Sequence, residues 1–166
     1  MGLYQHIREW ESEVKEMNEL NRMRGMWVIL ISLAFAASAC AIWPRAIKPM
    51  TAEDFVGNAR EKILEITVED AKYKIDSGVS LVILDVREPD EFKNGHIPNA
   101  KNIPRGLLEF QVSSRIPDKA TLIITYCKSG ARSALAAYTL KQMGYNNVMN
   151  MAGGWLGWLK AGYPVE

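Results

Sequence analysis

Cysteine and histidine are both scarce in this chain of 166 residues. There are two of each, and they lie far apart as Cys40, Cys127, His6 and His96. No Cys-x-x-Cys pair and no His/Cys cluster exists, so we expect no zinc or other metal site and no cofactor. Two isolated histidines also give no support to a Ser-His-Asp catalytic arrangement.

An excess of charge of either sign is also missing. The chain has 20 basic and 19 acidic side chains, for a formal net charge of +1. It has no basic stripe with interleaved aromatic residues, so we expect no binding to nucleic acid. The length suffices for one ordinary domain with an extension, and it predicts no oligomeric state.

Charged residues are absent from residues 26–43, which read MWVILISLAFAASACAIW. As a helix this run would span roughly 27 Å, close to the thickness of a bilayer core. Trp27 and Trp43 bracket it as interfacial aromatics do, and Pro44 ends the pattern. We therefore expect residues 26–43 to form a single transmembrane helix that contacts the membrane, rather than a helix in a soluble core.

Small residues before Cys40 leave an alternative open. Ala37-Ser38-Ala39 resembles the end of a secretory signal, and Cys40 then resembles the acylated cysteine of a lipoprotein. The preceding segment is too long and too acidic for an ordinary signal, although translation from Met23 would favour one. Read from Met1, an uncleaved anchor fits better. Lys and Arg are balanced around the run, but its likeness to an export signal favours the exported side for the remaining chain.

Two further segments flank the run. Residues 1–25 carry apolar residues at helical spacing and are predicted to form an amphipathic helix. Residues 44–65 are predicted to form a linker and an approach helix, which would start near Thr51 with acidic residues in its first turn.

Residues 66–166 alternate strand-like with helix-like segments. The runs 81–84 and 122–124 are apolar without alternation, as in strands that are buried on both faces. We expect an α/β domain with a mainly parallel, five-stranded sheet flanked by helices. The expected strands are 66–68, 81–86, 100–103, 121–126 and 147–151, and the expected helices are 68–77, 89–94, 105–113, 133–143 and 154–161.

The most specific motif is the run CKSGARS at residues 127–133. It lies between an expected strand and an expected helix, where several backbone N–H groups converge on one sulfur. The helix N-terminus contributes about half a positive charge, and Lys128 and Arg132 contribute whole ones. Cysteines so placed have pKa values of roughly 3.5–7.5. The motif therefore predicts an activated sulfur nucleophile, Cys127, rather than an inert core cysteine.

Four motifs in this region resemble a single rhodanese domain, the sulfurtransferase fold. They are 84–88 (LDVRE), 95–100 (GHIPNA), 127–133 (CKSGARS), and the pair 153–155 (GGW) with 162–164 (GYP). They occur in the order and at the spacing of that family. The resemblance covers about three fifths of the chain, residues 66–166, and does not extend to residues 1–50.

The resemblance implies a persulfide mechanism. Cys127 would accept a sulfane sulfur from a small sulfur-containing anion or a protein persulfide and then pass it to a thiol or cyanide. The loop that binds the substrate and the outer sulfur would comprise Lys128, Ser129, Gly130, Ala131, Arg132 and Ser133. Ser129 and Ser133 are expected either to donate to the persulfide or to cap a helix that starts at Ser133.

Three further residues are expected to support the site. We expect Asp85 to bond a neighbouring loop, and Arg87 to brace a carboxylate such as that of Glu88 or Glu91 rather than to bind substrate. The larger two-domain thiosulfate enzymes carry a cation in the region where this chain has Glu91. An acid there would repel a doubly charged substrate unless Arg132 or Arg87 neutralised it.

Two other functions remain open. Rhodanese-like domains also serve as non-catalytic docking or sensing modules, a role that a membrane anchor would suit. Cysteine phosphatases and arsenate reductases use Cys-x5-Arg around a tetrahedral anion. Here the spacing is Cys-x4-Arg, a smaller ring that suits a single sulfur atom better.

Overall fold

The computed structural model describes residues 15–23 and residues 49–166. They belong to two compact units, 1–48 and 49–166, and each is described by itself. The expected transmembrane run 26–43 and the signal and lipidation alternatives at Cys40 lie outside the described residues. Within the described ranges, no helix combines the length and the hydropathy that a membrane crossing needs.

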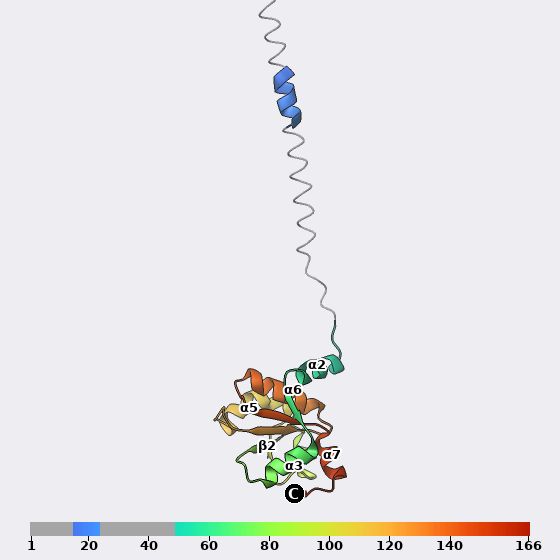
Figure 1. Ribbon diagram of the computed structural model, residues 1–166, viewed down its shortest axis with the longest axis vertical. Helices are drawn as coiled ribbons and strands as arrows, with labels where there is room; N and C mark the ends of the chain where they lie inside the picture. Colours follow the sequence, from blue (N-terminus) through green and yellow to red (C-terminus); the bar gives the residue numbers. More distant parts are fainter. Residues whose placement is uncertain (1–14, 24–48) are drawn as a thin grey trace, which may run out of the picture. The chain divides into compact units, whose positions relative to one another are not determined.

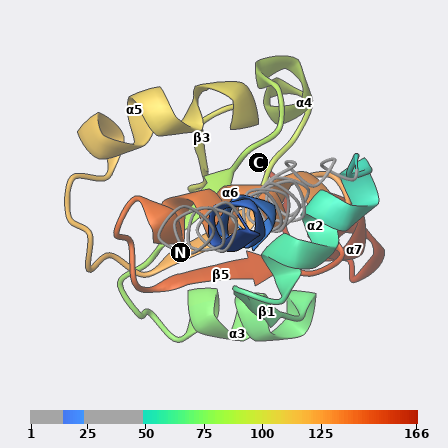
Figure 2. The same cartoon turned by 90° about the horizontal axis from the view of Figure 1, so that it is seen from above.

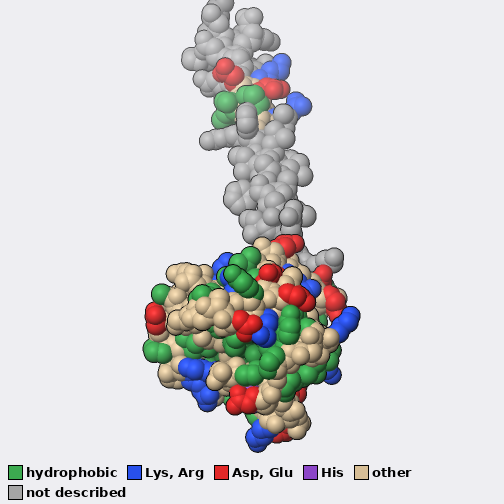
Figure 3. All heavy atoms as spheres, turned by 60° about the horizontal axis from the view of Figure 1, so that its bottom comes forward, with side chains coloured by type: hydrophobic (Ala, Val, Ile, Leu, Met, Phe, Trp, Pro, Cys, Tyr) green, Lys and Arg blue, Asp and Glu red, His purple; other side chains and the backbone are tan. Residues whose placement is uncertain are grey.

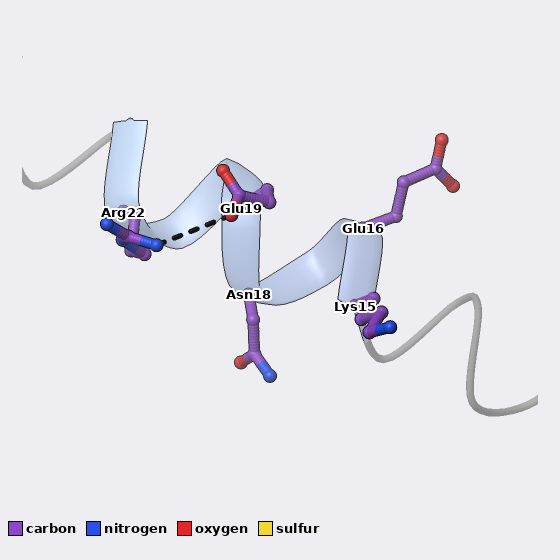
Figure 4. Close-up of a pocket in the computed structure, with 5 residues that line it drawn as sticks. All are labelled: Lys15, Glu16, Asn18, Glu19 and Arg22. Carbon is purple, nitrogen blue, oxygen red and sulfur yellow. Dashed lines mark hydrogen bonds and ion pairs between the residues drawn. The ribbon is translucent and has the colours of Figure 1, made fainter.

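Residues 15–23 form a helix, within the segment predicted to be helical from residue 1 to residue 25. Its labelled polar side chains point to different sides of the helix, with Glu16 on one side and Asn18 on the other (Figure 4). Arg22 and Glu19 form an ion pair at 3.4 Å, with side chains 81% and 68% exposed. Pairs this exposed contribute little to stability.

A five-stranded parallel sheet lies at the centre of the second unit, in the order β1-β5-β4-β2-β3. The strands are β1 (Leu64–Ile66), β2 (Val82–Asp85), β3 (Lys101–Asn102), β4 (Ile123–Tyr126) and β5 (Val148–Met151). Five parallel strands flanked by helices confirm the fold class that the apolar runs predicted. The central strand β4 is buried at all four positions, as a strand covered on both faces must be.

Helices cover both faces of the sheet (Figures 1 and 2). Helices α5 (Leu108–Arg115) and α6 (Ala131–Gln142) lie on one face, and α3 (Val68–Asp76) and α7 (Gly154–Lys160) lie on the other. Two short helices, α4 (Pro89–Lys93) and η2 (Arg105–Leu107), lie in the connections between β2 and β3 and between β3 and α5.

The side-chain alternation of the strands divides the core into two clusters. Leu84 and Ile123 pack with α5 and α6, while their neighbours Ile83 and Ile124 pack with α3 and α7. Cys127 belongs to the first cluster, and the buried Trp158 anchors α7 in the second. In the view of Figure 3, which brings the α3 and α7 side forward, apolar side chains lie among charged ones.

Segment 44–65, which we expected to be a linker and an approach helix, contributes two elements to the second unit. Helix α2 (Ala52–Arg60) packs against α6 and buries Ala59, and Thr51 caps it in a capping box with Asp54. Strand β1 then pairs with β5. The strand expected at 66–68 ends at Ile66, because Thr67 forms a second capping box with Asp70 and starts α3 at Val68.

Candidate active site

Cys127 directly follows β4, at the carboxyl end of the central strand. Ligands of open parallel sheets bind at this edge. The chain then turns through Lys128 and Ser129 to Gly130, which has a left-handed φ of 99° and is the N-cap of α6. Helix α6 therefore begins at Ala131, two residues before the predicted start at Ser133. The interpretation of Ser133 as the N-cap is wrong, because glycine at position 130 makes the turn earlier.

Two donors from the loop reach the sulfur of Cys127. The Gly130 N–H donates to Sγ at 3.2 Å, and the Ser133 hydroxyl lies 3.5 Å from Sγ and 3.2 Å from the Gly130 carbonyl. Backbone N–H groups in the first turn of α6 have no partner inside the helix. They and the helix dipole make this end of α6 a place where a negative charge is stabilised. Cys127 is 1% exposed, so its sulfur presents almost no surface to solvent.

The outer side of the loop carries exposed polar groups. Lys128 and Ser129 are exposed, while Ala131 is half-buried beside α2. A hollow of about 380 Å³ opens at Ala131, lined on its other side by Ala52, Val56 and Arg60 of α2. Helix α2 therefore borders the first turn of the candidate site.

Helix α7 holds the loop from its carbonyl side. The N–H of Trp155 donates to the Cys127 carbonyl at 2.7 Å, and that of Leu156 donates to the Lys128 carbonyl at 3.0 Å. This approach requires glycine at position 154. A Cβ there would lie 2.4 Å from the Cys127 carbonyl oxygen, and φ is 53°. The expected tight turn at Gly153-Gly154 is thus also a contact with the active-site loop.

A buried amide anchors the end of the loop. Asn150 of β5 is fully buried, and its Nδ2 donates to the Gly130 carbonyl at 3.2 Å and to Glu65 Oε1 at 2.6 Å. Its Oδ1 has no hydrogen-bond partner. Because the same Gly130 residue donates its N–H to Cys127, this contact helps fix the direction of that donor. Sequence reasoning missed Asn150 and Glu65, since no local pattern links β1 to a loop more than sixty residues away.

Arg132 forms a two-point ion pair with Glu91 of α4, at 2.9 and 3.0 Å. The pair explains the pKa of both groups. Hydrogen bonding to Arg132 lowers the pKa of Glu91, and hydrogen bonding to Glu91 raises the pKa of Arg132, with a smaller contribution from the nearby Cys127. Of the two cations that we considered as neutralising partners for Glu91, Arg132 is the one that contacts it.

Arg87 braces a carboxylate, as predicted, but not one of the two that we named as examples. Its guanidinium binds the carboxylate of Asp85 through Nε and Nη2, with Nη2–Oδ2 at 2.6 Å, rather than Glu88 or Glu91. It also donates to the Gly95 carbonyl at 2.9 Å and lies 4.6 Å from the ring centre of Trp155. Asp85 and Arg87 are 0% and 2% exposed. Asp85 therefore contacts the segment at Gly95 only indirectly: it binds Arg87, and Arg87 donates to the Gly95 carbonyl.

Candidate metal ligands do not gather anywhere in the described residues: no group of three His, Cys, Asp or Glu side chains is placed to bind an ion there. His96 instead has a structural contact, with Nδ1 3.0 Å from the Phe92 carbonyl and its ring stacked on that of Phe92.

The family model of the rhodanese-like domain matches residues 67–161. Among curated proteins, a sulfurtransferase of Allochromatium vinosum is 36% identical over 101 residues, which cover 61% of this chain and 92% of that protein. The putative sulfur carrier protein YrkF of Bacillus subtilis is 42% identical over 96 residues. These cover 58% of this chain and 51% of YrkF, so the match spans about half of that protein.

Two solved structures extend the likeness. A protein of unknown function from Rhodopseudomonas palustris, described as a possible tyrosine phosphatase, superposes with a TM-score of 0.67 at 32% identity, covering 75% of this chain and 99% of that one. The polysulfide-sulfur transferase of Wolinella succinogenes superposes with a TM-score of 0.59 at 32% identity, covering 67% and 83%. The family match agrees with the sequence motifs and with the parallel sheet that carries the loop at Cys127. The chain belongs to the family of proteins with a rhodanese-like domain.

Proposed function

We propose that the protein is a sulfurtransferase that carries a sulfane sulfur on Cys127. The observation that carries this proposal is the 3.2 Å hydrogen bond from the Gly130 N–H to Cys127 Sγ at the start of α6. The relatives named as sulfurtransferases support the same activity. Thiosulfate or a persulfide is the proposed donor, and a thiol or cyanide is the proposed acceptor.

The reaction proceeds in two balanced steps. The Cys127 thiolate attacks the outer sulfur of the donor, the bond within the donor breaks, and sulfite (from thiosulfate) or a thiolate (from a persulfide) leaves with the electron pair. Cyanide or a thiolate then attacks the outer sulfur of the Cys127 persulfide and releases the original thiolate. The Gly130 N–H and the free N–H groups of the first turn of α6 stabilise the anionic sulfur throughout.

Phosphatase chemistry is less well supported by this geometry. A cysteine phosphatase needs its loop arginine for the phosphoryl oxygens, whereas both terminal nitrogens of Arg132 bind Glu91. A purely docking function would need neither the cysteine nor the donors at its sulfur. A membrane anchor at residues 26–43, with the domain on the exported side, stays a proposal that rests on the amino-acid sequence alone.

Intact-mass spectrometry tests the proposal directly. After incubation with thiosulfate, we expect a gain of about 32 Da, one sulfur atom, that cyanide reverses. Cys127→Ser abolishes the gain, and Cys40→Ser is the matched control that retains it. Loading that disappears with Cys40→Ser, or no adduct from any sulfane donor, would overturn the proposal, and hydrolysis of an aryl phosphate would favour the phosphatase.

A further inference from the structure

Arg132, a cation of the loop beside Cys127, already has a partner. Arg132 and Glu91 share two hydrogen bonds, and their side chains are 37% and 33% exposed. Two opposite charges in contact present almost no net charge to an anion that approaches from outside the pair. Lys128 remains as an exposed cation on the loop.

Helix α7, which donates two hydrogen bonds to the loop, carries two exposed leucines. Leu156 donates its N–H to the Lys128 carbonyl at 3.0 Å, and the residue is 50% exposed. Leu159, one helical turn further along α7, is 45% exposed. A small inorganic dianion gains nothing from such a surface, whereas the carbon portion of an organic donor can bury apolar area against it.

Resting on the sulfur transfer proposed above, we propose that Glu91 is a specificity-determining residue that favours small organic persulfides of low net charge over thiosulfate. The transfer needs no other reactant. Cys127–S⁻ attacks the outer sulfur of R–S–SH, the sulfur–sulfur bond of the donor breaks, and Cys127–S–SH forms while R–S⁻ leaves. Glu91 acts by cancelling the charge of Arg132, and the exposed leucines of α7 accept the R group.

Glu91→Gln tests this role while keeping the fold. Glutamine can still accept the hydrogen bond from the Glu88 N–H, now 3.2 Å long, that starts α4. The test measures the rate at which Cys127 gains sulfur from thiosulfate, which is doubly negative, and from cysteamine persulfide. The persulfide is never negative, because its ammonium group gives it a charge of +1 in the S–SH form and no net charge in the S–S⁻ form. Asp90→Asn is the matched control, because it removes one negative charge from the same helix without touching the ion pair.

We expect Glu91→Gln to speed loading from thiosulfate by about tenfold and loading from cysteamine persulfide by less than about twofold. Asp90→Asn should change both by less than about twofold. Adding Arg132→Gln to Glu91→Gln should remove the gain with thiosulfate, because the freed cation is its source. Thermal unfolding of each variant confirms that the compared proteins are folded.

The outcomes separate this inference from the proposed function. Loading that Glu91→Gln leaves unchanged, or speeds equally for both donors, overturns the specificity role but leaves sulfur transfer in place. Loading by neither donor in any protein, wild type included, overturns sulfur transfer and the inference together.

Discussion

At the scale of single residues, the buried Asp85–Arg87 pair makes the sharpest stability prediction. Both side chains are almost fully buried, so removing one partner leaves a charge without compensation. Arg87→Ala should lower the free energy of unfolding by about 3–5 kcal/mol, measured by urea denaturation at neutral pH. Burial lowers the pKa of Arg87 and the bond to Asp85 raises it, and the net effect is a raised pKa for the Arg87 guanidinium.

An exposed pair supplies the control. Arg60 lies 3.4 Å from Glu65 with its side chain 43% exposed, so Arg60→Ala should cost less than about 1 kcal/mol. Replacing both buried charges, as Asp85→Asn with Arg87→Met, should recover part of the loss caused by Arg87→Ala alone. If Arg87→Ala and Arg60→Ala lowered the free energy of unfolding equally, the buried pair would contribute no more to stability than the exposed one.

Residue-scale sequence reasoning identified Asp85, Arg87 and Glu91 but not how they pair. The motif placed Arg87 within four positions of four acids, and sequence distance alone cannot choose between them. The choice follows from the strand: Asp85 ends β2 with its side chain buried, and the chain turns so that Arg87 folds back on it. Glu91 is then left for Arg132, which is 41 residues away.

At the scale of elements, the contact between α7 and the active-site loop depends on Gly154. Gly154→Ala would place a Cβ 2.4 Å from the Cys127 carbonyl oxygen and 3.0 Å from the Gly130 nitrogen. Both atoms belong to the backbone, so the loop or the helix must move. We expect sulfur loading of Cys127 to slow by at least about tenfold, and the free energy of unfolding to fall by about 1–3 kcal/mol.

Gly106→Ala is the matched control, because a Cβ at Gly106 meets nothing within 4 Å. It should leave both loading and stability nearly unchanged. Loading of Gly154→Ala at the wild-type rate, in protein that is demonstrably folded, would mean that α7 does not set the geometry of the loop.

Elements with strong local signals were predictable, and those set by distant contacts were not. The apolar runs at 81–84 and 122–124 predicted the buried parallel strands β2 and β4. The run 127–133 predicted the turn from strand to helix at Cys127. The start of α6 was misplaced because Arg132 and Ala131 look like loop residues until Gly130 adopts a left-handed φ. Strand β1 was misplaced because its short run, Leu64–Ile66, is a strand only through its pairing with β5.

At the scale of the whole molecule, the second unit is larger than the stretch that the family model matches. The family model begins at residue 67, whereas the compact unit begins at Pro49. The difference comprises α2, which buries Ala59, and β1, which pairs with β5 and carries Glu65 to Asn150. These contacts connect the added segment to the Gly130 end of the active-site loop.

Truncation therefore makes a graded prediction. A fragment of residues 49–166 should fold cooperatively and load sulfur at the rate of the full chain, because it keeps every contact described for the site. A fragment that starts at residue 61 keeps β1 but loses α2, and it should be less stable with loading close to normal. A fragment that starts at residue 67 also loses β1 and Glu65. The Gly130 end of the loop then depends on an Asn150 that no longer has its carboxylate partner, and loading should fall together with stability.

Glu65→Gln in the 49–166 fragment distinguishes the two causes of that fall. The substitution keeps β1 and its backbone pairing but replaces the charged acceptor of the 2.6 Å bond from Asn150 by a neutral amide. If the bond orients Gly130, loading should slow while the fragment stays as stable as the parent within about 1 kcal/mol. If loading is unchanged in Glu65→Gln and lost only when β1 is removed, β1 acts through the stability of the sheet edge. The sulfur site is then complete within residues 67–166.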